Sequence, residues 1–258
     1  FRLLKGEHIG LVGANGEGKS TFMNIVTGKL MPDEGKVEWS KNVHAGYLDQ
    51  HAVLEKGMTI GGVLKSAFDP LLQKEQRMNE ICDQLGDADP EQMEQLMEEL
   101  GTIQDELTLH DFYTIDAKVE EVARALGLLD LGLERDVTDL SGGQRTKILL
   151  GKLLLEKPDI LLLDEPLGAL DAFTRMNMQD EILNIWREQK QTVVMVTHDV
   201  EEAIYMGTRV LVMEPRPGRV KADIPIELAE PKQRDSEEFQ AYRNRILKML
   251  DLKHHTDH

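Results

Sequence analysis

Residues 13–20 constrain the fold of this chain more than any other stretch. They read Gly-Ala-Asn-Gly-Glu-Gly-Lys-Ser and fit the pattern G-x-x-x-x-G-K-[ST] at every fixed position. Because such a glycine-rich stretch cannot be regular structure, we expect a strand over the apolar run His8–Val12 before it. After it we expect a helix over Ser20–Val26 that ends at Gly28. A strand, a glycine loop and a helix in this order are typical of a phosphate-binding loop.

The chemistry of phosphate binding explains the residues of this loop. Successive backbone N–H groups form a cradle for an anion, and the following helix points its positive end at the same anion. Glycines allow the backbone to approach closely and to take positive φ. We expect Lys19 to reach the β- and γ-phosphates of a nucleotide and Ser20 to ligate Mg²⁺. The alternative is a tight turn that binds nothing.

Composition narrows the class of protein. The chain has 258 residues, which fits one large domain or a core with a subdomain, and its net charge is -17. That acidic balance argues against direct binding to DNA or attachment to an anionic membrane surface. Cys82 is the only cysteine, so no disulfide can form within the chain, which suits a cytoplasmic protein. We find no signal peptide and no apolar run near the ~20 residues of a membrane span, and we expect further residues upstream of Phe1.

The order of apolar runs predicts an α/β fold. Strand-like runs cover Val43–Leu48, Ile160–Leu163 and Thr192–Val196, and Pro32–Gly35 is expected as a turn between strands. Helical patterns cover Ile148–Leu155, Met178–Arg187 and Glu237–Leu250, and a closing hairpin is expected from Arg209–Met213 and Arg219–Ile226. We therefore predict a P-loop NTPase core, a mostly parallel sheet with helices on both faces, and an inserted α-helical subdomain.

This pattern predicts four segments. We expect residues 1–68 to form the first part of the α/β core and residues 69–155 to form the helical subdomain, which ends in the helix after Ser141. We expect residues 156–235 to form the second part of the core and residues 236–258 to form a C-terminal helix and tail.

The predicted helical subdomain is strongly acidic. Between Pro70 and His110 only Lys74 and Arg77 oppose a long series of Asp and Glu residues. Apolar residues recur at steps of three and four, as on one face of a helix: Met93, Leu96, Met97, Leu100, Ile103 and Leu107. We interpret the charges as a solvated face and the methionines as core; a partner-binding surface is the alternative.

Two carboxylates end the buried run Leu161–Leu163. Asp164 and Glu165 follow it directly, and a parallel strand delivers its C-terminal residues to the ligand crevice. We expect Asp164 to hold the Mg²⁺ shell through water, and Glu165 to polarise the attacking water as a general base or orienting group. The alternative for the pair alone is an acidic start of a surface helix.

The pentapeptide Leu140–Gln144 predicts a second phosphate-binding helix end. Ser141 is a natural N-cap, and Gly142 and Gly143 expose backbone N–H groups at the start of the next helix. Because the first loop already occupies one side of the nucleotide, this end can act from another molecule and cap the γ-phosphate. The alternative is a capped helix with a flexible lead-in.

These motifs together resemble the nucleotide-binding domain of ATP-binding cassette (ABC) proteins over nearly the whole chain. The order and approximate spacing match through the residue 13–20 loop, Gln50, Leu140–Gln144, Asp164-Glu165, Ala169–Asp171 and His198. The resemblance implies ATP and Mg²⁺ as cofactors, ATP hydrolysis, and a head-to-tail homodimer or pairing with a second cassette.

The resemblance also assigns roles to single residues. Gln50 is similar to the glutamine that contacts Mg²⁺ and water, Asp171 to the aspartate of the loop that crosses the dimer interface, and His198 to the histidine that contacts the γ-phosphate. Without the resemblance, Gln50 could be a polar residue at a strand end, Asp171 a helix cap, and His198 a histidine at a strand end. The implied catalytic residues are Glu165, His198 and Gln50, and the implied metal ligands are Ser20, Gln50 and Asp164. The nucleotide would be bound by Gly13, Asn15, Gly16, Gly18, Lys19, Ser20, Thr21, Ser141, Gly142, Gly143, Gln144 and Asp171.

Two branches of the family are represented. Up to about residue 160 the chain resembles the first cassette of ABC-F proteins, which are soluble, have two cassettes and act on ribosomes. This likeness rests on Gly13–Ser20, the acidic insert, Ser141–Lys147 and Leu149–Leu154. From there onward it resembles the ATPase subunit of nitrate, sulfonate and taurine importers, through Pro166–Asp171, Met178–Glu181, Val196–Asp199, Glu202–Tyr205 and Arg216–Arg219. Because Lys157–Pro166 suits both branches, we hypothesise a hybrid joined there.

The resemblance implies partners as well. The first hypothesis is the ATP-binding subunit of a transporter, peripheral on the cytoplasmic face of the inner membrane and docked on membrane subunits. The alternatives are a soluble ABC-F-type fragment that acts on ribosomes, or a nucleotide-binding hybrid without efficient turnover. The family carries an aromatic residue that stacks on adenine upstream of the position of Phe1, so we expect weakened base binding here.

Overall fold

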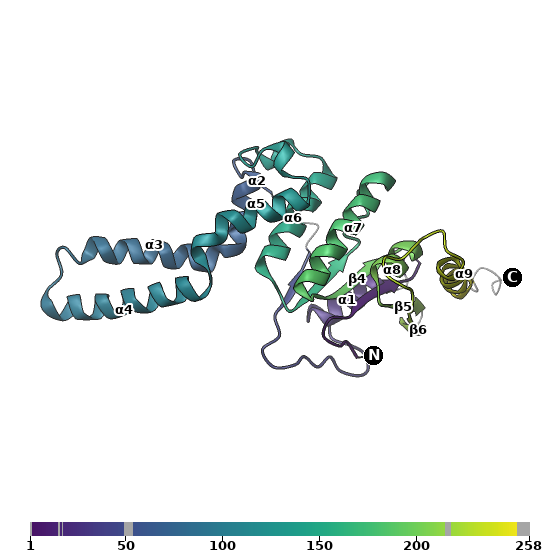
Figure 1. Cartoon of the computed structure of the whole chain (residues 1–258). Helices are drawn as coiled ribbons and strands as arrows, with labels where there is room; N and C mark the ends of the chain where they lie inside the picture. Colours follow the sequence, from purple (N-terminus) through teal and green to yellow (C-terminus); the bar gives the residue numbers. More distant parts are fainter. Residues whose placement is uncertain (1, 15, 17, 49–53, 215–217, 252–258) are drawn as a thin grey trace. The chain divides into compact units, whose positions relative to one another are not determined.

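A computed structural model describes residues 2–14, 16, 18–48, 54–214 and 218–251. Contacts divide the chain into two compact units, one of residues 1–52 with 157–258 and one of residues 53–156. The first unit is an α/β core, and the regular elements in the described part of the second are helices (Figure 1).

The described strands of the core form one six-stranded sheet. Its order is β2 (Ala45–Tyr47), β3 (Ile160–Asp164), β4 (Thr192–Thr197), β1 (His8–Val12), β5 (Arg209–Glu214) and β6 (Arg219–Pro225). The first five run parallel, and β6 pairs antiparallel with β5. Every residue of β1 and β4 is buried, as in a parallel sheet covered on both faces. The predicted mostly parallel sheet is confirmed.

Helices cover both faces of this sheet. On one face, α1 (Lys19–Val26) packs Met23 against Ile9 and Leu11 of β1. On the other, α8 (Val200–Met206) and α9 (Glu237–Asp251) form a cluster with Val12. Successive strand residues point to opposite faces, so β1 supplies both clusters by alternation. The fourth helix of the described core, α7 (Ala172–Gln189), is linked to α8 by a hydrogen bond from Gln179 Nε2 to Glu202 Oε1 (3.1 Å).

Close packing of α8 on β1 depends on Gly10. A Cβ atom added there would lie 2.8 Å from the Cβ atom of Ala203 and 2.9 Å from its Cα atom. The absence of a side chain at Gly10 therefore lets α8 lie against the strand that leads into the residue 13–20 loop.

The helical unit is built from α2 (Ile60–Lys65), α3 (Asp69–Gln84), α4 (Pro90–Leu109), α5 (Ile115–Ala125) and α6 (Gly142–Glu156). The pair α3 and α4 is an antiparallel hairpin that extends from the other helices of the unit (Figure 1). Arg77 and Glu99 join them by two hydrogen bonds of 2.8 and 2.9 Å, and Lys74 bonds Glu106 nearer the base.

The expectation that the methionines of α4 belong to a core is wrong. Ile103 and Leu107 are buried, but Met93 and Met97 are 41% and 59% exposed. The two methionines lie in the outlying half of the hairpin, where α3 alone covers one side of α4. A helical stripe shows which face is apolar, and it does not show how far along the helix a neighbour extends.

The expected boundary between the first core segment and the helical subdomain differs in the structure. Residues 53–68 belong to the helical unit and not to the first core segment, because α2 packs on α5 and α6, and Gly61 N donates to Leu133 O (2.8 Å). The C-terminal helix belongs to the core, because α9 packs on α8 and β5. The expected turn at Pro32–Gly35 does not join two strands, because the described residues between α1 and β2 form turns and irregular structure.

Candidate nucleotide site

The residue 13–20 loop leaves the carboxyl end of β1 and enters α1 at Lys19. Gly16 and Gly18 have φ values of 83° and 88°, a left-handed conformation that glycine takes without a steric penalty. The Lys19 side chain is buried, and its Nζ atom donates to the carbonyl oxygens of Gly13 (2.7 Å) and Ala14 (3.2 Å). The ammonium is thus held inside the loop. Ser20 and Thr21 lie in the first turn of α1, where backbone N–H groups have no helical acceptor.

The sheet register brings further predicted residues to the same edge. Val12 pairs with Thr197, and Asp164 pairs with Val196. The residues that follow these positions are Gly13, His198 and Glu165, so the loop, the histidine and the glutamate leave three adjacent strands at one edge.

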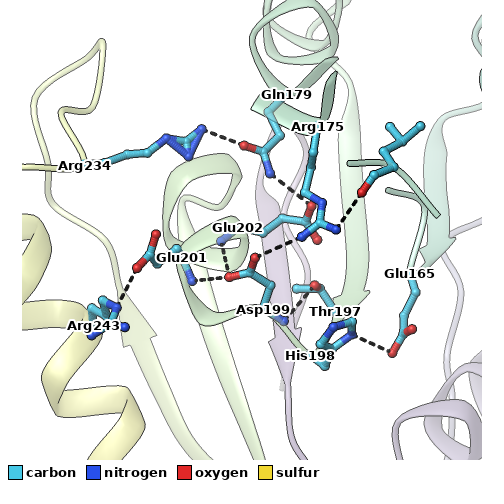
Figure 2. A network of polar contacts seen from close by, with 11 residues as sticks. Glu165, Arg175, Gln179, Thr197, His198, Asp199, Glu201, Glu202, Arg234 and Arg243 are labelled. Atoms are coloured by element: carbon cyan, nitrogen blue, oxygen red, sulfur yellow. Dashed lines mark hydrogen bonds and ion pairs between the residues drawn. The ribbon is translucent and has the colours of Figure 1, made fainter. Parts of the chain in front are cut away.

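Glu165 and His198 face each other across β3 and β4. Their Oε1 and Nδ1 atoms are 3.3 Å apart, and both side chains remain open to solvent (Figure 2). Glu165 has a positive φ of 46°, which is uncommon for a residue with a side chain, and its backbone N donates to Val196 O (2.8 Å). Such strained conformations cluster at functional sites. The pair can hold a water molecule next to a phosphate.

The carboxyl of Asp164 lies between opposing charges. Burial raises its pKa, the negative charge of Glu165 raises it further, and the positive charge of Lys19 lowers it. A cation bound nearby would offset the cost of burying this carboxylate beside a second one.

The predicted second helix end is formed in the helical unit. Ser141 Oγ accepts from Gln144 N (3.2 Å), and Gln144 Oε1 accepts from Ser141 N (3.0 Å), which is a capping box at the start of α6. The N-cap expectation for Ser141 is confirmed. Gly142 and Gly143 begin α6, so backbone N–H groups are available at this end.

Comparison with known proteins decides the family. A family model described as ABC transporter matches residues 1–168, about two thirds of the chain. The chain belongs to the ABC transporter family. It is an ATP-binding cassette, the ATPase component of that family, and its α/β core has the fold of P-loop NTPases.

Individual relatives agree with this membership. The ABC transporter ATP-binding protein YfmM of Bacillus subtilis is 64% identical over 200 residues, which are 78% of this chain and 38% of YfmM. The aliphatic sulfonates import ATP-binding protein SsuB of the same organism is 33% identical over 244 residues, 94% of this chain and 81% of SsuB. This cassette thus spans well under half of YfmM and most of SsuB.

Solved structures show the same fold. The dimeric structure of MJ0796, a bacterial ABC transporter cassette, matches with a TM-score of 0.60 at 22% identity, over 88% of each chain. The archaeal ribosome recycling factor aABCE1, solved with the ribosomal stalk protein aP1, matches with a TM-score of 0.62 at 26% identity, over 96% of this cassette and 38% of that chain.

The donor set of the cassette fits a nucleotide-bound Mg²⁺. The described residues contain no cluster of three His, Cys, Asp or Glu side chains that would hold a metal by itself. Mg²⁺ in nucleotide sites takes one or two protein oxygens and completes its shell with phosphate oxygens and water. The Ser20 hydroxyl and the Asp164 carboxylate suit that arrangement.

Three of the predicted residues need separate comment. Asp171 is the N-cap of α7 and accepts from Thr174 N (3.0 Å), and the hydrogen bonds from Thr174 hold the pKa of its carboxyl below the usual range. Within one chain its side chain is therefore a helix cap. Asn15 and Gln50 lie outside the described residues.

A polar network behind His198 was missed by sequence reasoning. It joins Arg175, Asp199, Glu202 and Gln179, which come from α7 and from the start of α8 (Figure 2). An aspartate directly before a helical pattern, as at Asp199 before α8, indicates an N-cap and could have been predicted. Nothing local in the sequence indicates that Arg175 reaches Asp199, because their contact depends on the order of the strands.

Proposed function

We propose that this cassette binds Mg-ATP between its residue 13–20 loop and the Ser141 segment of a second cassette, hydrolyses it there, and drives a membrane transporter. The observation that carries the proposal is the meeting of the loop, Glu165 and His198 at one edge of three adjacent strands. Each of these groups has a separate task in phosphoryl transfer to water.

Binding begins with the loop. In the structure Lys19 Nζ donates to the carbonyl oxygens of Gly13 and Ala14, so the ammonium already lies against the start of the loop. When the phosphates enter, the ammonium exchanges these carbonyls for the β- and γ-phosphate oxygens. Ser20 and Asp164 would hold Mg²⁺, directly and through water, and the ion would offset charge on the β- and γ-phosphates.

The chemical step falls to Glu165 and His198. A water molecule held by the Glu165 carboxylate is positioned to attack the γ-phosphorus, and the carboxylate orients it or accepts its proton. His198 lies within hydrogen-bonding range of the same carboxylate and contacts the γ-phosphate with its imidazole. The positive φ of Glu165, at the end of β3, is the kind of strained backbone conformation that is found at functional sites.

A second cassette completes the site. The N-terminal end of α6 presents backbone N–H groups after Gly142 and Gly143, and such helix ends bind phosphate. Head-to-tail pairing would place this end of one molecule over the γ-phosphate held by the loop of the other, with Asp171 at the interface. The dimeric state named for the MJ0796 cassette supports this arrangement.

The partner we propose is the membrane part of an importer. SsuB is named as an import ATP-binding protein, and its alignment, at 33% identity, covers 94% of this cassette. None of the helices among the described residues has the length and hydropathy to cross a bilayer. We propose a peripheral place on the cytoplasmic face of the membrane, held there by the partner.

Two variants test the hydrolytic assignment. Glu165→Gln should lower turnover by about 10²- to 10⁴-fold, the usual contribution of a positioned acid–base group, and leave ATP binding intact. Lys19→Ala should weaken ATP binding itself. Unchanged turnover in Glu165→Gln would remove the proposed role of this residue.

Co-sedimentation tests the proposed partner. Co-sedimentation of the cassette with transporter-containing vesicles would support a role in an importer, whereas co-sedimentation with ribosomes alone would replace that role with one in translation.

A further inference from the structure

Arg175 connects two loops of the nucleotide site. It lies in the first turn of α7, four residues after the N-cap Asp171. Its Nη2 atom donates to the Leu170 carbonyl (2.9 Å), and its Nη1 atom lies 3.5 Å from Oδ2 of Asp199 (Figure 2). One planar guanidinium therefore contacts the segment that presents Asp171 and the residue next to His198.

The residues on both sides of His198 are fixed by hydrogen bonds. Asp199 Oδ1 accepts from the backbone N atoms of Glu201 (2.9 Å) and Glu202 (3.2 Å) and so caps α8. Asp199 N donates to the Thr197 hydroxyl (3.1 Å). The second carboxylate oxygen of Asp199 is the one that meets Arg175. His198 thus stands on a short turn whose orientation Arg175 helps to set.

The charge of Arg175 matters here because two carboxylates lie close together. Glu202 is almost fully buried, and burial raises its pKa; the nearby charge of Asp199 raises it further, and the charge of Arg175 lowers it. Hydrogen bonds from Thr197 and Gln179 also favour the charged form. Without the guanidinium, the carboxylates of Asp199 and Glu202 would repel each other next to the turn that carries His198.

We propose that Arg175 is a positioning residue that couples the Asp171 segment to His198. A partner cassette that contacts Asp171 shifts the Leu170–Asp171 backbone, Arg175 follows its carbonyl acceptor, and Asp199 carries the shift to the His198 turn. His198 is then oriented for hydrolysis only when the partner cassette also contacts the Asp171 segment. This inference rests on the proposed function, since it concerns the same site.

A matched pair of variants tests the coupling. Arg175→Met removes the guanidinium and keeps an apolar stem, whereas Arg243→Met breaks a similar ion pair, Arg243 Nε to Glu201 Oε1 at 2.6 Å, on the same first turn of α8 but away from His198 (Figure 2). We expect Arg175→Met to lower kcat by roughly 10- to 100-fold, the cost of a small misplacement at a reacting centre, while KM for ATP changes less than about threefold. Arg243→Met should keep the wild-type kcat. Equal values of kcat in the two variants would overturn the proposal.

Two further variants separate positioning from folding. Arg175→Lys keeps the charge, but a lysine ammonium cannot reproduce a planar two-sided contact, so kcat should recover only in part. Asp199→Asn keeps a good N-cap and removes the charge that faces Arg175. The double variant Arg175→Met with Asp199→Asn should lose no more activity than the worse single variant, and losses that multiply would contradict the coupling.

A readout without turnover keeps this inference distinct from the proposed function. The imidazole NMR signal of His198, assigned from a His198→Gln variant, should shift in Arg175→Met and stay in place in Arg243→Met. A wild-type protein that hydrolyses no ATP would refute the proposed function, and the NMR comparison would still decide the positioning role. An unmoved His198 signal in Arg175→Met would overturn it.

Discussion

Alanine at Gly10 should loosen the contact between β1 and α8. The added Cβ atom would lie 2.8 Å from Ala203 Cβ, 2.9 Å from its Cα and 3.0 Å from its carbonyl oxygen. Carbon atoms prefer separations of about 3.5–4.0 Å, so α8 must move away by roughly 0.5–1 Å. Overpacking of this kind costs about 1–3 kcal/mol, and for a protein of this size each kcal/mol lowers Tm by roughly 2–4 °C.

The assay compares thermal unfolding of Gly10→Ala with that of Gly101→Ala. Gly101 lies in α4 and an added Cβ atom would meet nothing within 4 Å, so alanine there should raise stability by about 0.5–1 kcal/mol. Because α8 also carries the Asp199 cap beside His198, Gly10→Ala should lower kcat as well. A Gly10→Ala protein as stable and active as wild type would refute the packing argument.

Further variants address other parts of the structure. Ser141→Ala removes one half of the capping box and should destabilise the helical unit by about 1 kcal/mol, measured by urea unfolding; Ser141→Asn should retain most of the cap, and equal loss in both variants would exclude a capping effect. Met97→Gln should change stability by less than about 0.5 kcal/mol because the side chain is exposed, and a loss of several kcal/mol would show that Met97 is buried in solution. Burial lowers the pKa of Lys232 from 10.5 to about 8, so between these values the unfolded chain binds more protons and the free energy of unfolding rises with pH. The free energy of unfolding of wild type, minus that of Lys232→Met, should therefore become more positive by about 2 kcal/mol from pH 7.5 to pH 9.5. A difference that does not change with pH would contradict the lowered pKa.

Buried strands were the easiest features to predict. The expected strands over His8–Val12, Ile160–Leu163 and Thr192–Val196 agree with β1, β3 and β4 to within one residue at each end. Parallel strands covered on both faces are continuously apolar, and the polar residues that follow them mark their ends. The order of strand, glycine loop and helix around residues 13–20 and the Ser141 cap were also predictable, because they depend on residues close together in the sequence.

Features that depend on distant contacts could not be predicted. Arg175 and Asp199 are 24 positions apart in the sequence, and they meet because the fold brings the start of α7 to the start of α8, where Gln179 also bonds Glu202. The exposure of Met93 and the membership of α2 in the helical unit depend on where other helices end. The roles given to the site residues, and a hybrid joined near Lys157–Pro166, stay predictions; sequencing the source DNA across that stretch tests the second.

The most direct test of this account is the mass of the Glu165→Gln variant in solution, measured by light scattering with and without Mg-ATP. A cassette whose loop and Ser141 segment bind one nucleotide from two molecules should remain a 29.2 kDa monomer alone and double in mass with Mg-ATP. Slow turnover in this variant should keep the dimer intact during the measurement. A monomer at saturating Mg-ATP would contradict the shared site and leave a cassette that binds nucleotide by its own loop alone.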